Sequence, residues 1–198
     1  MKTEQIFNFL ERIANLLRTD TRKAGVCKGL QPVQMEALHY LSCCNRYSNT
    51  PAAVSDYLGL TKGTVSQTLG VLENAGFIEK LPDLKDRRIV HLQLTEMGQV
   101  LVNESIPPKL LEAAMELTTE TEQEFILSAL SQILQAMQQA NKLKSFGVCK
   151  TCRYHQLEVE NLRRCALTGE TLTNKDSEKI CREHVLLGSG DAKPLRVA

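Results

Sequence analysis

The sequence predicts a mainly helical protein with one small β-hairpin, followed by a short cysteine-rich unit. Apolar residues recur at three- and four-residue steps through most of the first 144 residues, which is the helical period. The period changes to two only around residues 77–94, where two extended runs enclose a charged turn. Four of the seven cysteines follow, between Cys149 and Cys181. We therefore expect a helical domain at 1–144, a four-cysteine segment at 145–187 and a flexible tail at 188–198.

Composition indicates a globular protein without a marked charge. A length of 198 residues with 42% hydrophobic content allows one core plus an appendage. The N-terminal run MKTEQIFNFLERI is charged and amphipathic, so we predict no signal peptide, no membrane partner and a cytoplasmic location. A net charge of +1 means that any contact with nucleic acid needs locally placed charge. Scattered histidines, without a glycine-rich phosphate loop or nucleophile elbow, argue against an enzyme.

Four helices are predicted before the hairpin. Gly59 and Gly76 stand where helix C-termini need a residue that tolerates positive φ. Thr61 can cap the fourth helix by accepting a hydrogen bond from a free backbone N–H group of its first turn. We expect these helices at about 3–22, 33–44, 51–57 and 62–74.

Two more helical features are predicted after the hairpin. Thr95 can cap a helix that breaks at Pro107 and Pro108, because proline removes a helix donor and clashes with the preceding turn. Thr119 and Glu122 have the spacing of a capping box, and a long amphipathic run follows them.

The helices at 51–57 and 62–74 are joined closely enough to predict a helix-turn-helix. In this motif the second helix enters the major groove of DNA with its N-terminus first. Gln67 can pair with a base edge, Lys62 can neutralise a phosphate, and Gly63 lets the backbone approach closely. An ordinary polar helix face is the alternative. The candidate DNA-binding residues here are Thr61, Lys62, Gly63, Thr64, Ser66, Gln67 and Thr68.

The hairpin downstream favours the DNA-binding interpretation over a solvated turn. A two-stranded ribbon tipped with Lys85, Arg87 and Arg88 can reach the minor groove beside a helix in the major groove. Asp83 and Asp86 would repel phosphate, so we expect them to brace the turn and orient the arginines. Together, the two closely joined helices and the hairpin predict a winged helix-turn-helix.

The first 144 residues or so resemble the MarR-type (multiple antibiotic resistance regulator) winged helix proteins. The resemblance rests on the run Gly76-Phe77-Ile78-Glu79-Lys80, on Asp86-Arg87-Arg88, and on Leu94-Thr95-Glu96-Met97-Gly98. It implies an obligate homodimer, held by the first and the last two helices, that binds a pseudo-palindromic operator in double-stranded DNA. It also implies that Lys62, Thr64, Ser66 and Gln67 face the groove and that Arg87 is the wing-tip arginine. The apolar stripes of the first and last helices independently favour a dimer.

The cysteine-rich segment predicts a metal centre with Cys149, Cys152, Cys165 and Cys181 as ligands. Twelve residues separate Cys152 from Cys165, and fifteen separate Cys165 from Cys181. Only Cys149 and Cys152 form a close pair, whereas a zinc ribbon usually has two such pairs. We therefore favour an iron–sulfur cluster and keep zinc as the alternative. Idle thiols are the third possibility. His155 and His184 are nearby, but four cysteines complete the ligand set without them.

The remaining cysteines and the nearby cations suggest lesser roles. Cys43 and Cys44 end a helix and read as core thiols, whereas Cys27 is a reactive sensor only if a neighbouring cation lowers its pKa. Four cations adjoin the predicted ligands and would offset the negative charge of a four-thiolate centre: Lys150, Arg153, Arg164 and Arg182.

Three functions follow from these patterns. The leading hypothesis is a repressor whose operator affinity is set by the state of the four-cysteine centre, as a redox or iron sensor. Typical MarR-type proteins end at the long last helix, so the added segment makes a small organic effector less expected. The second hypothesis is a zinc-stapled regulator with an organic ligand or Cys27 as input. The third, a thiol oxidoreductase using Cys149 and Cys152, is disfavoured because that pair follows a long helix instead of opening a βαβ unit.

Overall fold

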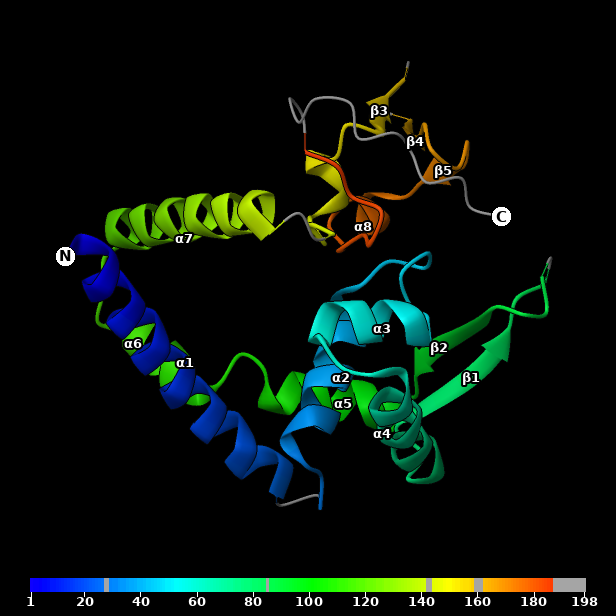
Figure 1. Cartoon of the computed structure of the whole chain (residues 1–198), viewed down its shortest axis with the longest axis horizontal. Coiled ribbons are helices and arrows are strands. Elements are labelled where there is room, and N and C mark those ends of the chain that lie inside the picture. The colour runs from blue at the N-terminus through cyan, green and yellow to red at the C-terminus, as the bar shows by residue number, and fades with distance from the viewer. Residues whose placement is uncertain (27–28, 85, 142–143, 159–161, 187–198) are drawn as a thin grey trace.

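The computed structural model describes residues 1–26, 29–84, 86–141, 144–158 and 162–186. Seven helices and a two-stranded hairpin precede a small three-stranded sheet in these residues (Figure 1). The helices are α1 (Lys2–Val26), α2 (Pro32–Cys43), α3 (Pro51–Leu58), α4 (Lys62–Asn74), α5 (Glu96–Ser105), α6 (Lys109–Glu116) and α7 (Glu120–Asn141). The predicted mainly helical fold with a hairpin is confirmed. Helix α6, between the proline pair and α7, is an element that the sequence patterns did not predict.

The predicted helix ends are formed by the expected residues. The hydroxyl of Thr61 accepts a hydrogen bond from the backbone N–H of Thr64 at the start of α4. Gly59 ends α3 with a φ of +65°, which explains why a glycine stands between the two helices. Thr119 and Glu122 form the reciprocal hydrogen bonds of a capping box at the start of α7.

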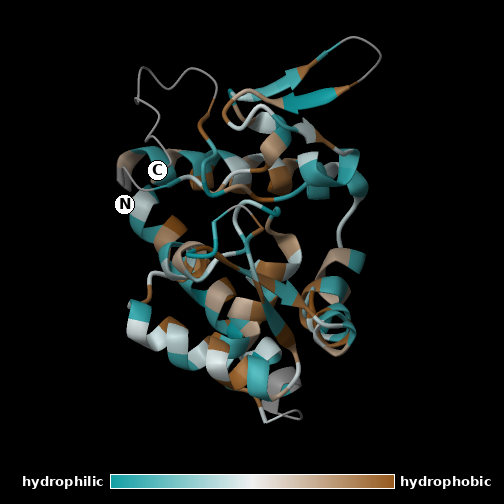
Figure 2. Ribbon diagram, turned by 90° about the vertical axis from the view of Figure 1, so that its right-hand side faces the viewer, coloured by the Kyte–Doolittle hydropathy of each residue, from teal (hydrophilic) through white to brown (hydrophobic). Residues whose placement is uncertain are grey.

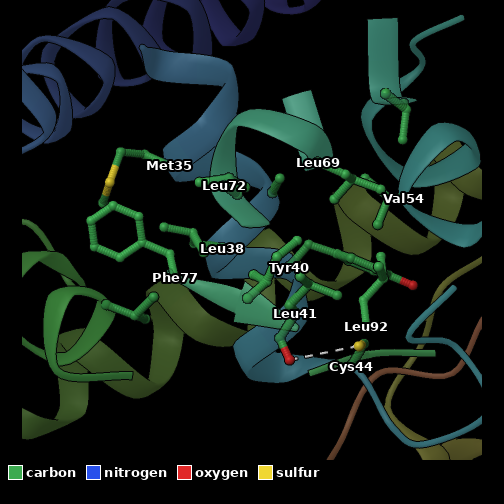
Figure 3. Close-up of a cluster of buried hydrophobic side chains, with 14 of the residues drawn as sticks. Met35, Leu38, Tyr40, Leu41, Cys44, Val54, Leu69, Leu72, Phe77 and Leu92 are labelled. Atoms are coloured by element: carbon green, nitrogen blue, oxygen red, sulfur yellow. Dashed lines mark hydrogen bonds between the residues drawn. The ribbon is translucent and has the colours of Figure 1, made fainter. Parts of the chain in front are cut away.

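Helix α2 is central to the hydrophobic core. Met35, Leu38 and Tyr40 on α2 pack against side chains of α3, α4, the hairpin and α5 (Figure 3). Leu38 and Tyr40 have no exposed surface, and the Tyr40 hydroxyl donates a hydrogen bond to the carbonyl of Ser48. Cys44 is buried at the end of this cluster, as predicted for a core thiol. The core therefore fixes α2, α3 and α4 relative to one another.

The hairpin consists of β1 (Ile78–Pro82) and β2 (Val90–Leu94), paired antiparallel with Ile78 opposite Leu94 and Pro82 opposite Val90. It follows α4 after a tight turn, in which the Phe77 N–H donates to the Leu72 carbonyl at 2.9 Å. We call β1, β2 and the turn between them the wing. Because α4 and β1 are joined so tightly, the position of the wing depends on the position of α4.

Gly98 explains part of the signature that follows the wing. Thr95 caps α5 by accepting from the Gly98 N–H at 3.1 Å, and its own hydroxyl donates to the Gly76 carbonyl at 2.7 Å. This turn brings Gly98 against the backbone of Phe77, where a Cβ atom would overlap the Phe77 carbonyl oxygen. The glycine is needed because two backbone segments meet there.

We expect Gly98→Ala to destabilise the fold by about 1–3 kcal/mol, because backbone must shift to admit the methyl group. Gly70→Ala is the matched control, since a Cβ there meets nothing within 4 Å. In helix α4 that change should leave stability unchanged or raise it by up to about 1 kcal/mol. Urea unfolding followed by circular dichroism measures both; equal stability of the two variants would contradict the role given to Gly98.

The cysteine-rich unit, described at residues 144–158 and 162–186, forms a small fold of its own on the winged helix. It contains η1 (Cys149–Thr151), β3 (His155–Leu157), β4 (Arg163–Cys165), β5 (Thr171–Leu172) and α8 (Asn174–Ser177), with sheet order β3-β4-β5. Its backbone pairs with the winged helix where the Ile180 N–H donates to the Cys43 carbonyl and the Asn45 N–H donates to the Ile180 carbonyl. The unit therefore lies beside the α2–α3 connection (Figure 1).

Helices α1 and α7 carry apolar side chains that this chain does not cover. Hydrophobic and hydrophilic residues alternate along the helical ribbons (Figure 2). On α1 and α7, however, Phe9 is 71% exposed and Phe125 is 75% exposed, and Leu134 and Met137 are also exposed. No helix among the described residues combines the length and apolar character that crossing a membrane requires. These two helices thus present an apolar surface outside the core of the single chain.

Candidate functional site

Helix α4 presents most of the predicted DNA-binding residues to solvent. Lys62, Gly63, Thr64, Ser66 and Gln67 are all exposed, and they lie within the first two turns. The buried stripe of α4 fixes this orientation, because its apolar side chains are held in the core. A Cβ atom on Gly63 would meet only the Thr61 hydroxyl, at 3.9 Å, so the fold itself does not require glycine at this position.

Thr68 is a correction to the predicted set. Its side chain is buried, with 6% of its surface exposed, on the same side of the helix as Val65, Leu69 and Leu72. The residue type suggested a base or phosphate contact, but the three- and four-residue spacing from Val65 and Leu72 places it inward. Thr61 remains exposed and acts as the helix cap.

The wing turn is braced by its two aspartates, as predicted. The Asp86 N–H donates to Asp83 Oδ1 at 2.8 Å, and the Arg88 N–H donates to Asp86 Oδ1 at 3.0 Å. Arg87 and Arg88 are exposed at the tip, whereas Lys85 lies outside the described residues. The carboxylates are thus committed to backbone amides, and the arginine side chains extend into solvent.

The strands of the wing are tied to the helix that precedes them and to the α2–α3 connection. Lys80 on β1 pairs with Glu73 on α4, with Nζ and Oε2 2.6 Å apart. On β2, the ring of His91 lies between Asn49 Oδ1, at 2.6 Å from Nδ1, and Asp83 Oδ2, at 3.0 Å from Nε2. Sequence reasoning missed His91, because the residues that it joins are far apart in the chain.

The four predicted ligands are brought together by the cysteine-rich unit. Cys149, Cys152, Cys165 and Cys181 all line one small, partly enclosed cavity. They come from η1, the residue after it, the end of β4 and the segment after α8. Cys149 and Cys152 are buried, and we call this space the four-cysteine cavity.

The surroundings of the cavity raise the pKa of two of its thiols. Burial, followed by the neighbouring thiols of Cys181, Cys152 and Cys165, raises the pKa of Cys149 to about 12. Burial also raises the pKa of Cys181, although hydrogen bonds from Asn45 and Ser48 act in the opposite direction. Four thiolates so arranged repel one another unless a cation is bound between them.

The cavity is lined by four thiol donors. Among the described residues, no three His, Cys, Asp or Glu side chains are arranged as ligands of a single metal ion. All four cysteines nevertheless face the same cavity, and the Val185 N–H donates to Cys152 Sγ at 3.4 Å. Backbone N–H donors to cysteine sulfur stabilise thiolate ligands. The donor set is therefore of the thiolate kind that both zinc sites and iron–sulfur clusters use.

The two candidate histidines have other partners. His184 is 5% exposed, and its Nδ1 and Nε2 atoms lie 2.7 Å from Ser145 Oγ and 2.9 Å from Thr151 Oγ1. Because both ring nitrogens are engaged, His184 is a structural residue of the unit. His155 lines the cavity, but its Nε2 lies 3.1 Å from Ser177 Oγ.

The cations beside the cysteines form ion pairs and a ring contact, most of them within the cysteine-rich unit. Lys150 pairs with Glu178 at 2.6 Å, and Arg164 pairs with Glu158 at 3.5 Å. Arg182 reaches across to Asp56 on α3, with Nε and Oδ2 2.9 Å apart. The guanidinium of Arg153 stacks over the Tyr154 ring. Charge compensation for the cavity, predicted from their sequence positions, is therefore not their evident role.

Two of the remaining three cysteines, Cys43 and Cys44, lie within the described part of the chain. Burial raises the pKa of Cys44 to about 12 and also raises the pKa of Cys43, which agrees with their prediction as core thiols. Cys27 and the adjacent Lys28 lie outside the described residues.

Residues of the α2–α3 connection complete the cavity wall. Asn45 and Tyr47 line it together with the cysteines, although they belong to the winged helix. The Tyr47 hydroxyl donates to Glu170 Oε2 at 2.6 Å, and Asn45 is 2% exposed. The sequence predicted only a polar loop here, because nothing local indicates that a distant segment covers it.

Residues 28–89 match the sequence model of the MarR family. The chain is also similar to the transcriptional repressor MprA of Escherichia coli K12, with 33% identity over 82 residues. That similarity covers 41% of this chain and 47% of MprA, so the chain spans about half the length of the curated relatives that it matches.

Two solved structures are similar over most of the helical part. FabT of Streptococcus pneumoniae, in complex with DNA, is 25% identical with a TM-score of 0.57, and the match covers 70% of this chain and 99% of FabT. A MarR transcriptional regulator from Methanosarcina mazei is 22% identical with a TM-score of 0.60, covering 69% of this chain and 99% of that protein. The fold is therefore that of MarR-type winged helix proteins, and about three tenths of the chain lies outside each match.

Proposed function

From its MarR-type winged helix we infer that this chain is a transcription regulator that binds duplex DNA and acts as a repressor in the cytoplasm. The observation that carries this inference is the pairing of α4, with its exposed residues from Lys62 to Gln67, and an arginine-tipped wing that follows it directly. A helix and a ribbon so placed suit adjacent major and minor grooves. The name of MprA as a repressor and the DNA complex of FabT support the same function.

The proposed active form is a homodimer. The exposed apolar residues of α1 and α7, such as Phe9 and Phe125, support it, because burying them in a second copy removes a large apolar surface from water. Two copies also present two recognition helices, which suits a pseudo-palindromic operator.

Selection of duplexes from a random-sequence DNA pool tests this function. We expect enrichment of a two-fold symmetric site whose half-sites are about one helical turn apart. The Gln67→Ala variant should relax base preference at one position in each half-site, because glutamine reads base edges in the major groove. Recovery of sequences with no common site would contradict sequence-specific recognition.

The proposed input is an iron–sulfur cluster held by Cys149, Cys152, Cys165 and Cys181, with operator affinity depending on its redox state or iron supply. Support comes from four thiols around one cavity and from the hydrogen bond that the Val185 N–H donates to Cys152 Sγ. When bound, such a group would supply positive charge that lets four neighbouring thiolates coexist.

Anaerobic purification with iron, sulfide and zinc analysis tests the centre. We expect a coloured protein with iron and sulfide, and loss of both in the Cys149→Ser variant. The Cys43→Ser variant is the matched control, because Cys43 lies outside the cavity wall. Two results together would instead favour a zinc staple with an organic ligand or Cys27 as input. They are a colourless protein with one zinc per chain and an operator affinity that does not change with redox state.

A further inference from the structure

The α2–α3 loop, residues 44–50, lies between the four-cysteine cavity and the wing. One end of the loop contributes to the cavity wall, and the other end contacts β2 of the wing. The loop also leads directly into α3, where the Thr50 hydroxyl caps the helix by accepting from the Ala53 N–H. A change in this loop can therefore reach both parts of the winged helix.

On the cavity side, the loop is held to the residues around Cys181. The Asn45 N–H donates to the Ile180 carbonyl at 2.8 Å, and the Arg182 N–H donates to Ser48 Oγ at 2.8 Å. Asn45 and Cys181 also both line the four-cysteine cavity. The residues on both sides of Cys181 are thus hydrogen-bonded to the loop.

On the wing side, Asn49 makes two contacts with β2. Its carbonyl oxygen accepts from the Leu92 N–H at 2.7 Å, and its side-chain Oδ1 lies 2.6 Å from His91 Nδ1. His91 and Asn49 are both partly buried, so bulk water competes little for this hydrogen bond. Asn49, the residue after Ser48, therefore bonds the α2–α3 loop to the wing.

From His91 the hydrogen bonds continue to the tip of the wing. His91 Nε2 lies 3.0 Å from Asp83 Oδ2, and the other oxygen of Asp83 accepts from the Asp86 N–H. Asp86 in turn accepts from the Arg88 N–H. Hydrogen bonds and the short chain segment from Ser48 to Asn49 thus lead from Arg182, the residue after Cys181, to the arginine tip.

We propose that the α2–α3 loop couples the four-cysteine cavity to the wing, with His91 as the positioning residue that joins Asn49 to Asp83. This inference rests on the proposed cysteine centre and specifies how its state reaches the DNA-binding surface. Loading the cavity changes the bonding of Cys181, which shifts the balance between ordered and open arrangements of the loop and wing. The wing, rather than α4 alone, is then the part of the DNA-binding surface that responds.

Hydrogen exchange of wing amides, measured on the full chain, tests the coupling without an operator. The protein is compared after anaerobic loading with ferrous iron and sulfide and after removal of metal by a chelator. We expect loading to slow exchange at the Asp83, Ile89 and Leu92 amides about fivefold or more. In His91→Leu the difference should fall below about twofold at Asp83 and Ile89, while iron and sulfide content stays that of the wild type.

Two further variants separate coupling from a structural defect. Gln93→Leu introduces a leucine as His91→Leu does, but at an exposed position of β2 two residues later. This variant should keep the full response to loading. Asn49→Ala removes the side-chain contact but keeps the carbonyl that bonds Leu92, so it should reduce the response at Asp83 more than at Leu92.

The coupling would be overturned if loading did not change the exchange rates of the wild-type wing amides, or if the change persisted in His91→Leu. Either result would leave the proposed centre intact. If iron and sulfide are not taken up, zinc replaces them as the probe. If metal analysis finds neither iron with sulfide nor zinc bound to the chain, that result overturns both the centre and the coupling.

Discussion

Replacing Arg87 and Arg88 together with alanine is expected to weaken operator binding by about a hundredfold or more. Both side chains extend into solvent from the wing tip, so their loss should leave the free energy of unfolding nearly unchanged. Each guanidinium that contacts phosphate or lies in a narrow minor groove also displaces counterions. The slope of log affinity against log salt should therefore become shallower, by about two to four in a dimer.

Fluorescence anisotropy with a selected duplex, over a series of salt concentrations, measures both quantities. Arg12→Ala is the control for charge lost away from the wing, because Arg12 is exposed on α1 (Figure 1). It removes one positive charge per chain, whereas the double variant removes two. It should leave affinity and salt slope within about twofold of the wild type. An unchanged salt slope in the double variant would mean that the wing does not contact DNA.

Gly147→Ala is expected to open the cysteine-rich unit. A Cβ atom at this position would overlap the imidazole of His184, which cannot turn away because Ser145 and Thr151 hold its two nitrogens. The Gly147 carbonyl also accepts from the Cys181 N–H at 2.9 Å. An overlap of this kind costs about 1–3 kcal/mol, so the open state of the unit should be about tenfold to hundredfold more populated.

Alkylation of the metal-free protein, followed by mass spectrometry, reports this opening at Cys149, which is 6% exposed in the folded unit. We expect Cys149 to react faster in Gly147→Ala by the same factor, while Gly70→Ala reacts like the wild type. Adding His184→Ala to Gly147→Ala removes the overlap and should bring the rate back to that of His184→Ala alone. A rate unaffected by Gly147→Ala would show that the ring is not confined.

Much of the winged helix was predictable because its signals are local. The caps at Thr61 and Thr95, the positive φ at Gly59 and the change of period at the wing each depend on neighbours within a few residues. Thr68 was placed wrongly because residue type outweighed periodicity. The reason for Gly98 was not readable either, since it depends on the backbone of Phe77, more than twenty residues earlier.

The sequence alone determined which residues could form a site: the polar start of α4, the arginines of the wing and four cysteines with ligand-like spacing. It did so because helix periodicity, capping and ligand spacing are properties of short segments. The tertiary structure alone decided where the cysteines lie. Ile180 and Arg182 bond the α2–α3 loop, across more than 130 residues of chain, and bury Asn45 and Ser48 beneath the cysteine-rich unit. Contacts over such separations are set by packing and backbone pairing, for which no local pattern codes.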